Sequence, residues 1–203
     1  MKVKEVFGRA DYALISELIP NRARVLDLGC GDGALLAWLK EQKQIQARGV
    51  ERDRDLVQKA IARGVTVYQG DFENSLAEYP PGAFDYVILS QTLQEARRPL
   101  EVLEGMLRIG RHAVVAFPNF GHWRVRLAHL LSGRAPKTAL FPHEWYNSPN
   151  IHFLTVVDFE ELLARQRWAI EKKFFLAAGR DVRALPNLLA EVAIYLIRKS
   201  EAD

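Results

Sequence analysis

The chain has 203 residues, of which 49% are hydrophobic and 26% charged, a composition typical of a globular protein long enough to bury a sizeable core. Its formal net charge of +3 is spread along the sequence, which argues against the dense basic face of a nucleic-acid-binding protein. Charged residues interrupt the first 19 positions, and no apolar run approaches the roughly 18 residues of a membrane span. With one cysteine, which excludes an intramolecular disulfide, these features predict a cytoplasmic protein without a membrane or nucleic-acid partner.

Short apolar runs alternate with helical patterns along the first 118 residues. The periodicity predicts helices at 8–19, 33–42, 53–63 and 98–109, and strands at 24–28, 46–51, 65–70, 84–90 and 112–118. The run "FDYVILS" at 84–90 is nearly continuous in apolar residues, as expected of a strand covered on both faces. This alternation predicts an α/β fold with a doubly wound, mostly parallel sheet.

The C-terminal third departs from that alternation. A predicted helix at 156–166 precedes strands at 168–179 and 191–200, and the short, polar connection between these strands predicts an antiparallel pair at the sheet edge. We therefore expect seven strands in a single domain spanning 1–203. An aromatic insertion at about 119–154 interrupts this domain, and long irregular segments in compact domains are usually functional or disordered. Its many aromatic residues argue against disorder.

The stretch "VLDLGCGDGALLAWL" joins the first strand to the following helix. Gly29, Gly31 and Gly33 would allow a tight turn there and let a ligand approach the backbone, while the helix N-terminus offers free N–H groups. Asp27 places a carboxylate just ahead of the glycines. The stretch therefore predicts a cofactor-binding loop.

Two cofactor classes compete for this loop. The pattern G-x-G-x-x-G/A is formally met from residue 29 onward, and Glu51 ends the second strand where an acid binds ribose hydroxyls, so a nicotinamide or flavin dinucleotide stays open. Asp27 argues against it, because its carboxylate would repel a pyrophosphate and suits an ammonium or sulfonium group instead. Gly33 adds a third glycine in D-x-G-x-G-x-G spacing, and 203 residues leave no room for a second catalytic domain.

Four motifs in chain order resemble those of the class I S-adenosylmethionine (SAM) dependent methyltransferases. They are "LDLGCGDG" (26–33), "GVERD" (49–53), "QGDFE" (69–73) and "FDYVILS" (84–90). The resemblance implies that SAM is the cofactor and that the glycine loop approaches its amino-acid part. It further implies that Glu51 binds the ribose hydroxyls and that Asp71, with Phe72, contacts the adenine.

The acceptor side is less specific. Ser90 and Gln91 follow the central strand at the sheet edge where α/β proteins bind ligands, so they are predicted to touch cofactor or acceptor, or to form a satisfied polar pair. The chain lacks an Asn-Pro-Pro-Tyr type motif there, which argues against methylation of bases or glutamine amides.

His122 is a candidate general base or a structural histidine. Cys30 is expected to pack rather than react. The histidine spacing predicts no metal site, and the catalytic residues stay unassigned.

A narrower resemblance covers about residues 11–198. "VYQGDFENSL", "FDYVILSQTLQ", "PNFGHWRVRLAHLLSGRAPKT" and "LFPHEWYNSPNIHFLT" are similar to the methionine biosynthesis protein W (MetW) family, with 118–160 the most specific part. The resemblance implies a role in bacterial methionine synthesis with homoserine O-acyltransferase as partner. The expected function is a SAM-binding accessory or regulatory subunit. The alternative is a methyltransferase acting on an unidentified small-molecule acceptor.

Overall fold

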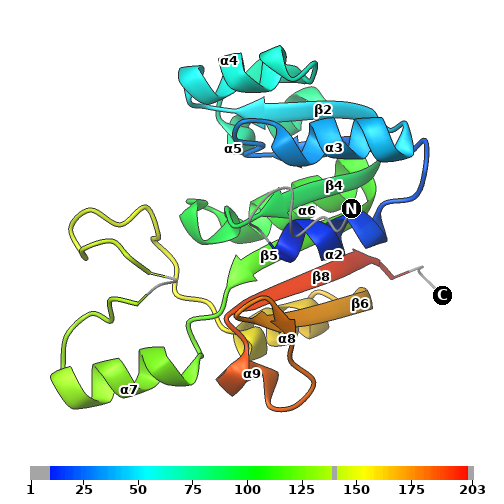
Figure 1. Cartoon of the computed structure of the whole chain (residues 1–203). Coiled ribbons are helices and arrows are strands. Elements are labelled where there is room, and N and C mark those ends of the chain that lie inside the picture. The colour runs from blue at the N-terminus through cyan, green and yellow to red at the C-terminus, as the bar shows by residue number, and fades with distance from the viewer. Residues whose placement is uncertain (1–9, 139–140, 201–203) are drawn as a thin grey trace.

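A computed structural model describes residues 10–138 and 141–200, and within them the chain builds one mixed sheet (Figure 1). The strand order is β3-β2-β1-β4-β5-β8-β6-β7. The strands are β1 Arg24–Leu28, β2 Gln46–Glu51, β3 Thr66–Gln69, β4 Phe84–Ser90, β5 Gly110–Pro118, β6 Trp168–Ala177, β7 Arg180–Asp181 and β8 Val192–Lys199. Strands β1 to β5 pair in parallel, whereas β8 pairs antiparallel with both β5 and β6.

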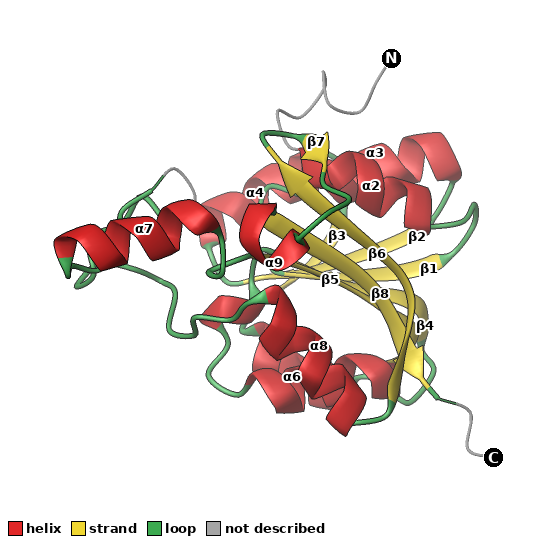
Figure 2. Cartoon of the chain, turned by 90° about the horizontal axis from the view of Figure 1, so that it is seen from below, coloured by secondary structure: helices red, strands yellow, loops and turns green. Residues whose placement is uncertain are grey.

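Helices cover both faces of the sheet, as Figure 2 shows. They are α2 Ala10–Leu18, α3 Ala34–Lys43, α4 Arg54–Ala62, α5 Phe72–Ser75, α6 Pro99–Ile109, α7 Trp123–Ser132, α8 Val156–Arg165 and α9 Pro186–Leu189, with 3₁₀ turns η1 Leu76–Glu78 and η2 Leu93–Glu95. Helices α2 and α3 lie on one face, and α6 and α8 lie on the other. No helix in the described part of the chain is long and apolar enough to cross a membrane.

The side-chain alternation of the strands divides the core into two layers. Val25 points into the layer under α2 and α3, while its neighbour Leu26 points into the layer under α6 and α8. The second layer contains Phe117, Phe159 and Tyr195, which pack with ring centroids 4.9–6.0 Å apart. Hydrophobic burial on both faces explains why the central strands are so apolar.

The predicted α/β class, the parallel order and the antiparallel terminal pair are confirmed. The sheet of the described residues has one strand more than expected, because the chain after β6 folds back as the two-residue β7. The connection to β8 contains the short helix α9 rather than a crossover helix. The predicted helix at 8–19 is seen from residue 10 onward, and its first two residues lie outside the described part.

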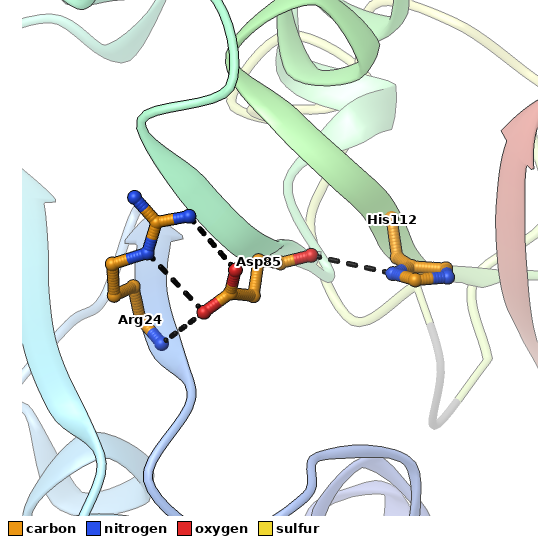
Figure 3. A network of polar contacts seen from close by, with 3 residues as sticks. All are labelled: Arg24, Asp85 and His112. Atoms are coloured by element: carbon orange, nitrogen blue, oxygen red, sulfur yellow. Dashed lines mark hydrogen bonds and ion pairs between the residues drawn. The ribbon is translucent and has the colours of Figure 1, made fainter.

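An ion-pair seam joins strands at the amino ends of the parallel sheet (Figure 3). Arg24 of β1 binds Asp85 of β4 through its backbone N–H at 2.9 Å and through two guanidinium nitrogens at 2.8 and 3.3 Å. His112 of β5 lies 3.4 Å from the Asp85 carbonyl oxygen, and its other ring nitrogen lies 3.3 Å from Glu171 of β6. These contacts link β1 to β4, β4 to β5, and β5 across β8 to β6, at the edge opposite the glycine turn.

We predict that Asp85→Asn destabilises the fold in a pH-dependent way. The hydrogen bonds from Arg24 lower the pKa of the Asp85 carboxyl, so its contribution is present above the unfolded pKa of about 3.9. The contribution is lost as the pH falls through the folded pKa. Urea unfolding should therefore show a wild-type advantage at pH 7 that shrinks below about pH 4. Asp181→Asn, which removes an exposed ion pair with Arg183, is the control, and an equal loss there would contradict the prediction.

Candidate functional site

The β1–α3 turn is built from three residues with left-handed backbone. Gly29, Gly31 and Gly33 have φ of +73°, +58° and +72°, conformations that glycine adopts without the cost of a Cβ. The backbone N–H groups of Gly29 and Cys30 donate to the Val50 carbonyl at 2.8 and 3.0 Å. The turn is therefore held against the carboxyl end of β2.

Gly31 and Gly33 have different surroundings. A Cβ on Gly33 would lie 2.7 Å from the Ala60 Cβ, so this position lets α3 pack closely against α4. A Cβ on Gly31 would meet nothing within 4 Å. The backbone at Gly31 therefore borders open space, where a ligand can approach it.

Glu51 ends β2 and holds the main chain around the turn. One carboxylate oxygen accepts from Gly31 N–H at 2.9 Å, and the other accepts from Arg52 and Asp53 N–H at 2.8 and 2.9 Å. These bonds fix the carboxylate between the ends of β1 and β2. The expected acid after the second strand thus lies beside the glycine loop.

A cavity of about 370 Å³ opens at this edge of the sheet. Four predicted site residues line it: Gly29, Glu51, Asp71 and Phe72. Asp71 is the N-cap of α5 and accepts from Glu73 N–H at 2.8 Å, so its carboxylate has a fixed orientation. The structure brings together the ends of the first three parallel strands, as predicted from their order.

The five other predicted residues, Asp27, Gly31, Gly33, Ser90 and Gln91, lie outside the lining of this cavity. Asp27 is buried on β1, with 4% of its surface exposed. Ser90 donates to the Asp11 carboxylate of α2 at 3.2 Å. Gln91 adopts a left-handed φ of +58°, and its carbonyl accepts from the Gln94 side chain at 2.7 Å. A non-glycine residue with this conformation stores strain, a feature found at many ligand sites.

Five polar residues and one proline that line the cavity were not predicted from the sequence. They are Arg52, Glu73, Thr92, Glu95, Arg97 and Pro149. Burial is the main cause that raises the pKa of Glu95. Thr92 and Glu95 follow β4 directly, so the rule that ligands bind at carboxyl strand ends could have found them. Pro149 lies about 60 residues beyond that strand, and no local signal places it here.

His122 and Cys30 have structural roles. The His122 ring accepts from Arg124 N–H at 3.3 Å and caps helix α7, and burial lowers its pKa, which favours the neutral ring that this cap requires. Burial, followed by the charges of Asp27 and Glu51, raises the pKa of the Cys30 thiol. The thiol is therefore a poor nucleophile. Among the described residues, no group of His, Cys, Asp and Glu could hold a metal ion.

The aromatic insertion is closed at its base by Asn119. The fully buried Asn119 side chain accepts from Gly121 and Val156 N–H, at 3.0 and 3.3 Å, and donates to the Ala190 carbonyl at 2.8 Å. The two ends of the aromatic insertion are thus held together. Its far part reaches the cavity, where it contributes Pro149.

The sheet order and the glycine turn at its carboxyl edge define the fold of class I SAM-dependent methyltransferases. A SAM-dependent methyltransferase from Mesorhizobium loti superposes with a TM-score of 0.67 over 95% of this chain and 99% of that chain, at 18% identity. The [4+2]-cyclase SpnF superposes with a TM-score of 0.65 over 94% of this chain and 81% of its own, also at 18% identity. At this identity the likeness establishes the fold alone.

The chain belongs to the MetW family. The family model described as "Methionine biosynthesis protein MetW" matches residues 9–197. A relative from Rhodopirellula baltica, "Bifunctional methionine biosynthesis protein MetXA/MetW", is 35% identical over 197 residues, which cover 91% of this chain and 32% of that protein. The chain therefore spans about a third of the length of this curated relative.

We predict that Gly33→Ala destabilises the fold more than Gly31→Ala. Both substitutions place a Cβ at positive φ, which costs about 1–2 kcal/mol, but only the Cβ added at position 33 would collide with Ala60. Overpacking adds roughly another 1–3 kcal/mol. Urea unfolding of both variants measures the difference. Ala60→Gly should recover part of the Gly33→Ala loss and none of the Gly31→Ala loss, and equal losses would contradict the packing role.

Proposed function

We propose that this protein is a SAM-binding accessory subunit that acts with homoserine O-acyltransferase in methionine biosynthesis. The observation that carries the proposal is the fused relative, which joins a MetW part to MetXA, the homoserine acyltransferase, in one polypeptide. Fusion keeps two proteins at a high effective concentration, which is useful when they work on one another. We propose that the separate chain described here forms the same association by binding.

The geometry of the cavity supports SAM as the cofactor. A fixed carboxylate at Glu51 suits the two ribose hydroxyls, and the capped Asp71 with the Phe72 ring suits an adenine. Gly29 lines the cavity, and the open space beside Gly31 in the same turn leaves room for the amino-acid part of SAM. The carboxylates of the cavity suit its positive charge. Gly29, Glu51, Asp71 and Phe72 line the proposed cofactor site. The other predicted residues, Asp27, Gly31, Gly33, Ser90 and Gln91, are proposed to complete it from the adjoining turn and strand ends.

Methyl transfer places few demands on the side-chain chemistry of the protein. Bound SAM would supply an electrophilic methyl on its sulfonium, so a methyltransferase needs mainly to position and desolvate an acceptor. The same fold also carries a protein named as a cyclase. In this chain the His122 ring is committed to a helix cap, which argues against a role for it as a general base.

We predict that Glu51→Ala weakens SAM binding by about tenfold to a hundredfold, because hydrogen bonds to a charged group contribute roughly 1.5–3 kcal/mol each. Isothermal titration calorimetry with SAM measures the effect. Glu41→Ala on the exposed side of α3 is the matched control. Equal SAM affinity in wild type and Glu51→Ala would contradict the site, and binding of NADH in place of SAM would favour the dinucleotide alternative.

We predict that the acyltransferase and this chain form a complex whose acyl-transfer rate responds to SAM. SAM is made from methionine, so a SAM-bound subunit would report supply to the entry step of the route. Purified homoserine O-acyltransferase from the same organism is assayed with this chain, with and without SAM. The response should disappear with Glu51→Ala at a SAM concentration that saturates the wild type.

Two results would count against this proposal. Failure to form a complex at micromolar concentration would contradict the partnership. Release of S-adenosylhomocysteine in the presence of a candidate acceptor, with no effect on the acyltransferase, would favour the small-molecule methyltransferase instead.

A further inference from the structure

Helix α7 carries an apolar stripe on its outer side. Trp123, Leu127, Leu130 and Leu131 follow the i, i+4, i+7, i+8 spacing of one helical face, yet they are 41%, 42%, 79% and 76% exposed. Such a stripe normally faces a core. Here α7 projects beyond the sheet in both views, so the stripe packs on neither face of it (Figures 1 and 2).

Other residues of the insertion also expose apolar side chains. Trp145, Tyr146 and Phe153 are 77%, 69% and 71% exposed. A groove of about 630 Å³ lies between α7 and this segment, with Phe120, Val125 and Phe141 at its base. We call the stripe, the three exposed aromatics and the groove the α7 surface.

The α7 surface is not needed to close the fold. The Asn119 side chain already accepts backbone N–H bonds at both ends of the insertion. The rings of Phe120 and Phe141, with centroids 3.8 Å apart, stack on one another inside it. Leaving further large apolar side chains in water is unfavourable. Contiguous exposed apolar surface rimmed by polar groups marks an interaction site.

The charge of the insertion indicates the kind of partner. Residues 119–154 contain four basic side chains, Arg124, Arg126, Arg134 and Lys137, but a single acidic one, Glu144. Glu144 is paired with Lys137 at 2.6 Å, and Arg124 lies 3.9 Å from Glu191 outside the insertion, so the basic side chains still outnumber the acidic ones. A second copy would bring two such basic rims together and be repelled, whereas an apolar surface with an acidic rim would be attracted.

The α7 surface is also connected to the cofactor cavity. The Gln94 carbonyl accepts from both Ile151 and His152 N–H, at 2.9 and 3.0 Å. These bonds tie the segment that carries Pro149 and Phe153 to η2, whose Glu95 lines the cavity. One face of this segment thus borders the cavity and the other contributes to the exposed surface.

We infer that the α7 surface is where the acyltransferase docks, through an apolar patch rimmed by acidic residues, and that the 149–153 segment links this interface to the cofactor cavity. The inference rests on the proposed function for the partner's identity. Leu130 and Leu131, the most exposed leucines of the stripe, act as anchors at its C-terminal end.

The test compares two double variants of the full chain in titrations against purified homoserine O-acyltransferase. Leu130→Ser/Leu131→Ser should weaken the complex on the order of tenfold or more, since buried apolar anchors dominate interface affinity. Ile61→Ser/Leu185→Ser, which removes two exposed apolar side chains elsewhere, should leave it unchanged. Both variants should bind SAM as the wild type does. Raising the salt concentration should slow association of the wild type.

The outcomes separate the two proposals. If the wild type binds the acyltransferase and Leu130→Ser/Leu131→Ser binds equally well, the surface is wrong while the partnership stands. If the wild type fails to bind, the proposed function fails, and the docking inference fails with it. If sedimentation reveals a wild-type homodimer that Leu130→Ser/Leu131→Ser dissociates, the occupant is a second copy and the inference is overturned.

Discussion

The turn between β1 and α3 depends on backbone conformations that residues with a Cβ rarely adopt. Gly29, Gly31 and Gly33 take left-handed φ within five positions, and an L-residue pays about 1–2 kcal/mol for each such conformation. This turn lets the main chain bond to β2 at Val50 and present the Gly31 N–H to Glu51. The third glycine then allows α3 to meet α4 at Ala60. The cavity exists at this edge because these three requirements are met together.

The cavity combines several carboxylates with few cations, and its electrostatics follow from how each acid is held. Glu51 and Asp71 accept backbone N–H bonds, and Glu73 accepts from Arg97 N–H at 2.7 Å, so the main chain holds all three carboxylates in place. Burial raises the pKa of the Glu95 carboxyl. A cation bound nearby would offset that desolvation. The four carboxylates of the lining, against two arginines, support the proposal of a sulfonium or ammonium ligand rather than a pyrophosphate.

The sequence predicted the parts of this structure that are encoded locally. Strand alternation gave the class and the antiparallel end, and the glycine spacing with Glu51 and Asp71 located the cavity edge. Contacts between distant segments could not be predicted in this way. Pro149 reaches the cavity only because Asn119 closes the insertion and Gln94 holds its far part. The hydrogen bond between Ser90 and Asp11 likewise joins residues 79 positions apart, so no local pattern predicts it. The β7 turn was missed because two residues are too short for a periodic signal.

The link between the insertion and the cavity sets a thermodynamic condition on any regulation through this chain. If SAM changes the affinity for the partner by some factor, the partner must change the affinity for SAM by the same factor. The coupling has to pass through elements that touch both regions, and the Gln94 carbonyl with its two bonds to Ile151 and His152 is such an element. A partner that orders the 149–153 segment would also fix one wall of the cavity at Pro149. Ordering one site would then lower the entropic cost of binding at the other.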